Sequence, residues 1–68
     1  MDITWDKDEA EGTTEASDMG WKPGIWYNDF IAEGKKYVKH STLRDNENEI
    51  LEVRYRGPGG RVIRVFND

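Results

Sequence analysis

Residues 50–66 read ILEVRYRGPGGRVIRVF, and this stretch decides the fold. Its first half alternates apolar and charged side chains, which is the pattern of a strand with one buried face. Glycine and proline then interrupt the alternation at positions 57–60 and favour a tight turn. The remaining residues include valine and isoleucine, which favour strands. The stretch therefore predicts an antiparallel hairpin formed by residues 50–56 and 61–66.

The register of this hairpin can be argued from charge. A loop over residues 57–59 opposes Glu52 to Arg64, which gives an ion pair across the two strands. A loop that is one residue longer would instead oppose Arg56 to Arg61, and like charges would then face each other. We therefore expect the shorter loop, in which apolar residues also pair on the opposite face.

The charged face of the hairpin also carries apolar residues. We expect apolar groups to cover this face, either from elsewhere in the chain or from a partner molecule. Tryptophan is frequent at interface hot spots, so Trp21 and Trp26 are the expected anchors of such a contact. The predicted protein interface consists of Trp21, Trp26, Ile50, Val62 and Phe66.

Residues 25–43 allow two structures. Their β-branched and aromatic content favours strands, and either the Glu-Gly pair at positions 33–34 or the Gly-Lys pair at positions 34–35 fits a tight hairpin turn. One register of this hairpin pairs Phe30 with Tyr37. Another register pairs Asp29 with His40 and Ile31 with Val38. The alternative is a helix over about residues 28–40, whose acidic residues come early and whose lysines come late, as the helix dipole favours. We expect the hairpin.

The charge of the chain is unevenly distributed. Acidic residues far outnumber the single lysine within residues 1–20, whereas basic residues outnumber acidic ones within residues 21–68. The stretch 6–19 shows no apolar periodicity, so it should bury too little surface to offset the entropy of ordering it. We therefore predict a disordered acidic tail over residues 1–20 and a single small folded domain over residues 21–68.

These patterns together predict a mostly β fold, namely a small antiparallel sheet of three or four strands with a disordered acidic N-terminus. The alternative is an α+β fold in which one helix over residues 28–40 packs on the C-terminal hairpin. A chain of 68 residues buries a modest core. Its stability must therefore depend on the aromatic side chains, each of which removes a large area from water.

The sequence holds little that could carry catalysis. There is one histidine and there is no cysteine, so a thiolate metal site is excluded. His40 and Ser41 are adjacent, and neighbouring residues of a strand point to opposite faces, so they do not pair as base and nucleophile. The glycine-rich turn lacks the Gly-Lys-Ser/Thr ending of a phosphate-binding loop. We expect a protein that is not an enzyme and that binds no cofactor and no metal.

Arginine and aromatic residues of the hairpin suggest an alternative function, the binding of single-stranded nucleic acid. The net charge of −4 argues against it, because nucleic-acid-binding domains are strongly basic. In this alternative the acidic tail folds over the arginines and acts as an autoinhibitor. The candidate residues are Arg54, Arg56, Arg61, Arg64 and Tyr55.

The expected function is a non-enzymatic protein-protein interaction or regulatory module with a protein as partner. A homodimer through a sheet edge or an apolar face is a further alternative. In its small size, acidic arm and aromatic content the chain resembles small phage-encoded proteins, which implies a host factor as partner. No apolar run approaches the roughly 20 residues that span a membrane, and no secretory leader is visible, so a cytoplasmic protein is expected.

Overall fold

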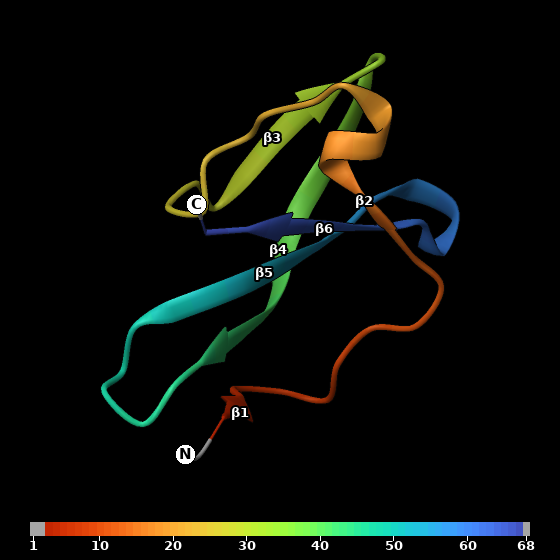
Figure 1. Ribbon diagram of the computed structural model, residues 1–68. Helices are drawn as coiled ribbons and strands as arrows, with labels where there is room; N and C mark the ends of the chain where they lie inside the picture. The colour runs from red at the N-terminus through yellow and green to blue at the C-terminus, as the bar shows by residue number, and fades with distance from the viewer. Residues whose placement is uncertain (1–2, 68) are drawn as a thin grey trace.

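The computed structural model describes residues 3–67, and within them six strands form one mixed sheet (Figure 1). The strand order is β1-β4-β5-β6-β2, with β3 also paired to β4. All pairs are antiparallel except β2 with β6, which run parallel. The mostly β fold is thus confirmed, although the sheet has more strands than expected and one parallel pair. The strands are β1 (Thr4–Trp5), β2 (Thr13–Glu15), β3 (Asp29–Ala32), β4 (Lys35–Arg44), β5 (Ile50–Arg56) and β6 (Val62–Phe66).

The C-terminal hairpin of β5 and β6 forms as predicted, but its register differs from the prediction. Arg54 lies opposite Arg64, and Glu52 lies opposite Phe66. The connection is longer because the 3₁₀ turn η2 (Pro58–Gly60) lies inside it, closed by a 2.7 Å hydrogen bond from the amide of Gly57 to the carbonyl of Arg61.

The two facing arginines are tolerated because Glu52 lies between them. Its carboxylate accepts hydrogen bonds from Nε of Arg54 at 2.7 Å and from Nε of Arg64 at 3.1 Å. One buried acid therefore neutralises much of the repulsion that the register argument treated as decisive. The observed register is offset by an even number of residues from the expected one, so each side chain still lies on its predicted face.

Strands β3 and β4 form the hairpin that the sequence favoured over a helix. Phe30 pairs with Tyr37, which is one of the two registers considered. Glu33 and Gly34 form the turn with φ values of 53° and 72°. Positive φ at both central residues defines a type I′ turn, whose twist matches that of the strands.

The expected disorder of residues 1–20 is wrong for residues 3–20, which form β1, β2 and the 3₁₀ turn η1 (Ala16–Met19). Ala10 and Ala16 are buried, and the ring of Trp5 packs 4.5 Å from the guanidinium carbon of Arg54. Such long-range contacts are invisible to a composition argument that treats the segment alone. The folded unit therefore includes this segment as well as residues 21–67.

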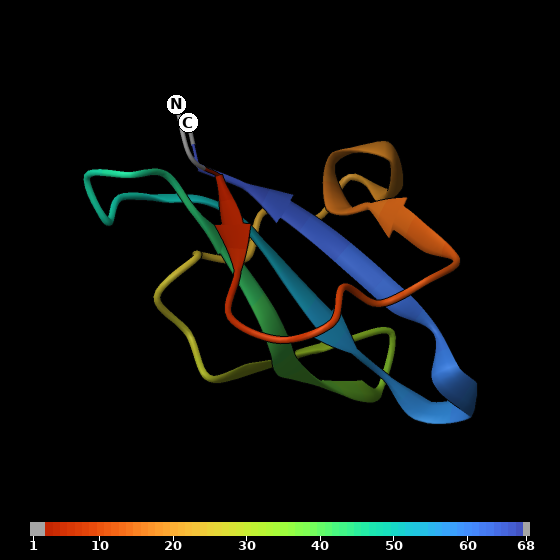
Figure 2. The same ribbon diagram turned by 90° about the horizontal axis from the view of Figure 1, so that it is seen from below.

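The two faces of the sheet are covered by different parts of the chain. One face, here the tyrosine face, carries Tyr37, Val53, Tyr55 and Ile63, each fully buried. Residues 16–28 lie over it on the upper side of Figure 1. The opposite face, here the arginine face, carries Glu52, Arg54 and Arg64, and residues 3–12 cross it (Figure 2).

Candidate functional site

The segment Trp21–Pro23 is held firmly at the rim of the tyrosine face. Turn η1 ends at Gly20 in the left-handed conformation with φ of 76°, and the amide of Trp21 then donates to the carbonyl of Ala16 at 2.9 Å. The Trp21 ring lies against Phe30 and Tyr37, at centroid distances of 6.5 and 5.8 Å. These contacts fix the segment to the core.

The hydroxyl of Tyr55 anchors the loop that follows. Its oxygen lies 2.9 Å from the carbonyl oxygen of Gly24 and 2.8 Å from that of Tyr27. The two carbonyls share the single hydroxyl proton. The side chain of Tyr55 thus joins the loop to strand β5 in the middle of the sheet.

Because of this anchor, the free energy of unfolding should fall at alkaline pH. Burial raises the pKa of Tyr55 to about 12, from an unfolded value of about 10. The contribution of Tyr55 to stability is therefore complete below about pH 10 and is lost as pH rises toward 12, up to about 3 kcal/mol. Urea denaturation across this range checks it, with the Tyr55→Phe variant expected to lose this part of the pH dependence. Identical pH profiles for the two proteins would contradict it.

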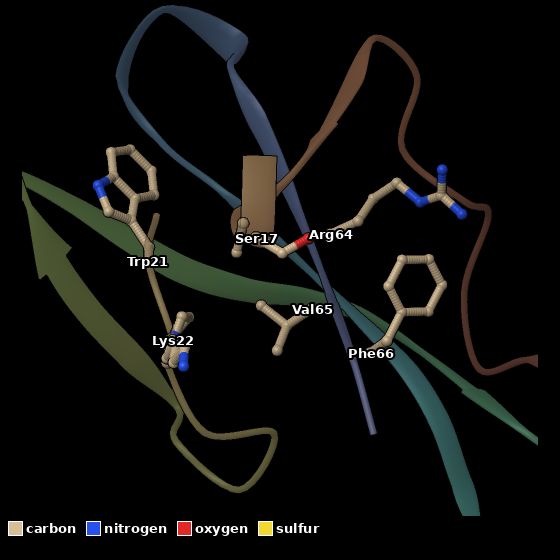
Figure 3. Close-up of a pocket in the computed structure, with 8 residues that line it drawn as sticks. Ser17, Trp21, Lys22, Arg64, Val65 and Phe66 are labelled. Carbon is tan, nitrogen blue, oxygen red and sulfur yellow. The ribbon is translucent and has the colours of Figure 1, made fainter. Parts of the chain in front are cut away.

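The first candidate site is a groove of about 300 Å³ beside the C-terminal end of β6, here the β6 groove. Trp21 and Lys22 stand on one side and Phe66 on the other, with Val65 between them (Figure 3). The groove brings together residues far apart in the sequence. Its lining comprises Ala16, Ser17, Trp21, Lys22, Pro23, Arg64, Val65 and Phe66.

A second groove of about 370 Å³ lies on the other side of Trp21–Pro23, along β3, and is here the β3 groove. Ile31 lines this groove and is 74% exposed. Trp21, Lys22 and Pro23 line both grooves, so the two grooves share one wall. The lining of the β3 groove comprises Trp21, Lys22, Pro23, Phe30, Ile31, Ala32 and Glu33.

Lys22 is the charged residue that both grooves share, and Glu33 adds an exposed carboxylate to the β3 groove. Lys22 is exposed and lines both grooves. Arg64 also lines the β6 groove, but its guanidinium is engaged by Glu52, and this hydrogen bond raises the pKa of Arg64. A ligand would thus meet a lining of mixed polar and apolar groups, with the ammonium group of Lys22 at both grooves.

The predicted protein interface is divided by the structure. Trp21 and Phe66 come together in the β6 groove. Ile50 and Val62 are 4% and 1% exposed, so they belong to the interior and line no surface. Trp26 is 75% exposed in the loop before β3 and lines neither groove.

The predicted nucleic-acid residues do not form one exposed face. Tyr55 is fully buried, so it offers no ring on which a base could stack. Arg61 lies beside the Trp21 ring, with its guanidinium carbon 5.6 Å from the ring centroid. Arg54 and Arg64 share Glu52, which leaves Arg56 as the exposed arginine of the set.

The acidic N-terminal segment does fold over the arginine face. The Nη1 atom of Arg54 donates to the carbonyl of Ala10 at 2.8 Å and lies 3.5 Å from the carboxylate of Glu9. The backbone amide of Thr42 also donates to the carboxylate of Asp6 at 2.8 Å. This segment, together with the ring of Trp5, covers the arginine face from within the chain.

Sequence reasoning missed Lys22, Pro23 and Ile31 as groove residues. The Pro-Gly pair at positions 23–24 favours a turn, and Ile31 lies in the stretch for which a hairpin is expected. Neither feature indicated a concave surface, because the walls come from segments that meet only in the folded chain.

Comparison with known proteins adds no assignment, since no protein family, curated protein or solved structure matched the chain. Within residues 3–67, His, Asp and Glu side chains form no group of three that could hold a metal ion. In this same part of the chain, no helix has the length and apolar character needed to cross a membrane.

Proposed function

We propose that this protein is a non-enzymatic binding module that holds an extended segment of a partner protein. The observation that carries the proposal is the shared wall formed by Trp21, Lys22 and Pro23, with a groove on each side. A segment that crosses this wall would place side chains in both grooves. By holding this segment, the protein would keep it from other contacts and so regulate the partner.

The chemistry of the grooves supports this proposal. Their volumes of about 300 and 370 Å³ suit individual side chains and lie at the lower end of the range for small-molecule sites. Trp21 and Phe66 supply aromatic surface at one groove, and aromatic anchors dominate interface hot spots. The rigid packing of Trp21 also limits the entropy that binding would cost.

The test is a selection of linear peptides from a displayed random library against the full chain. Binding of the selected peptides is then measured by titration calorimetry. Phe66→Ala removes apolar surface from the β6 groove, and Lys22→Glu reverses the charge of the shared wall. Each is expected to weaken binding by about fivefold or more, the scale of roughly 1 kcal/mol.

Two control variants change the same chemistry outside the grooves. Ile3→Ala removes an exposed apolar side chain, and Lys7→Glu reverses an exposed charge. Neither residue lines a groove, so both controls should bind the peptides as the unmodified chain does. Equal losses in groove and control variants, or a library that yields no binder, would overturn the proposal.

A further inference from the structure

The outer edge of β3 is open. In the part of the chain that the structure describes, β3 pairs with β4 alone. The amide of Lys39 donates to the carbonyl of Asn28 at 2.8 Å, and this bond sets the alternation of the antiparallel ladder. Every second residue from Asn28 turns its backbone groups toward β4. The N–H and C=O groups of Asp29 and Ile31 therefore point away from the sheet.

A side-chain pocket lies along this same edge. The β3 groove is lined by residues of the strand on one side and by Trp21–Pro23 on the other. Ile31 contributes outward backbone groups to this edge, while its exposed side chain points to the face opposite Phe30 and Ala32. Free backbone groups beside a pocket are the two elements of recognition by strand addition, in which the backbone supplies affinity and the pocket supplies specificity.

We propose that the partner segment binds as an additional strand on the outer edge of β3. Its backbone forms hydrogen bonds with Asp29 and Ile31, and alternate side chains enter the β3 groove. This inference rests on the proposed function and names the mode of recognition on the β3 side of the shared wall, before the segment crosses to the β6 groove.

The charges at this edge indicate the chemistry of the segment. Lys22 lines the groove and Lys35 is exposed next to the turn, whereas Glu33 is the acid that lines the groove. Asp29 is engaged by Lys36 at 3.6 Å. The edge is thus mildly basic beside a groove of mixed polar and apolar lining. It fits a segment whose groove-facing side chains are apolar and include one acid that meets Lys22.

A second copy of this chain fits the edge less well. If two β3 strands paired antiparallel about Ile31, Asp29 of each chain would lie opposite Glu33 of the other. Like charges directly opposite each other destabilise a strand pair. The whole chain also carries a net charge of −4, which favours a partner of other composition.

The test uses a peptide selected from the displayed library and compares two variants of Ile31. Ile31→Ala removes the side chain, and Ile31→Pro removes the side chain together with the outward N–H. Proline is tolerated where an edge-strand amide faces solvent, so the β3–β4 ladder should persist, which circular dichroism checks. Ile31→Pro is expected to weaken peptide binding about tenfold more than Ile31→Ala does.

A second measurement keeps the protein unchanged. Peptides that are N-methylated at one position at a time should lose binding at alternate positions, because only every second amide of an added strand faces β3. This pattern supports strand addition even if Ile31→Pro fails to fold.

Each other outcome overturns the inference in a distinct way. Equal binding by the two Ile31 variants together with a flat methylation scan would leave the proposed function standing without strand addition. A library that yields no binder removes both proposals. A dimer detected by light scattering and lost in Ile31→Pro would assign the edge to a second copy of the chain.

Discussion

Replacing Glu52 with glutamine is expected to lower the free energy of unfolding by about 3 kcal/mol, the lower end of the range for breaking a buried ion pair. Glu52 is 4% exposed and binds both Arg54 and Arg64. Glutamine keeps the shape of the side chain but removes the charge that the two guanidiniums share. Urea denaturation followed by tryptophan fluorescence measures the change.

The expected loss is held to the lower end because the arginines have other partners. The side chain of Arg64 is 30% exposed and retains water, and Arg54 keeps its contacts with Glu9 and Ala10. Glu47→Gln in the exposed connection between β4 and β5 is the matched control, with an expected change within about 0.5 kcal/mol. If the two variants lose the same small amount, water already satisfies both arginines and the ion pair contributes little.

The faces of the C-terminal hairpin could be predicted because strand alternation is a local property. Val53 and Tyr55 lie on one face and Arg54 on the other, as the sequence indicated. The register could not be predicted in the same way. It depends on one carboxylate, Glu52, that satisfies two arginines at once, and pairwise charge rules do not include such a shared acid.

The order of residues 3–20 depends on partners far along the chain. Strand β2 pairs with β6, and Arg54 bonds to the carbonyl of Ala10, 44 positions before it. Taken alone, the segment is acidic and poor in apolar residues, so its composition indicates disorder. The attraction between its acids and the arginine face, together with packing by Trp5, changes that balance.

The grooves were the least predictable feature. Their walls come from η1, the Trp21–Pro23 segment, β3 and the end of β6, and no local pattern brings these four elements together. Tryptophan content drew attention to Trp21 and Trp26 equally. The difference is packing, because Trp21 contacts Phe30 and Tyr37 whereas Trp26 is mostly exposed.

Replacing Gly57 with alanine is expected to destabilise the protein by about 3 kcal/mol, the upper part of the range for overpacking a core. A Cβ atom at this position would overlap Cε2 of the Tyr37 ring and lie 2.5 Å from Cδ2. The ring cannot move away easily, because it is fully buried and stacks on Phe30 at a centroid distance of 5.1 Å. Thermal unfolding followed by near-ultraviolet circular dichroism measures the loss.

The cause of this loss can be isolated, because Gly57 has an extended backbone with φ of −107° and ψ of −173° that any residue adopts. Gly24→Ala is the matched control, since its Cβ would lie 3.6 Å from the Tyr27 ring and its φ is not positive. We expect that control to change stability by less than about 1 kcal/mol.

Equal effects at both glycines would show that the Tyr37 ring yields at little cost. If the steric account holds, combining Gly57→Ala with Tyr37→Leu should cost less than the sum of the two single changes, by about 1 kcal/mol or more. Because Tyr37 supports Trp21, Gly57→Ala should also weaken peptide binding at the shared wall, which joins the packing of the core to the proposed function.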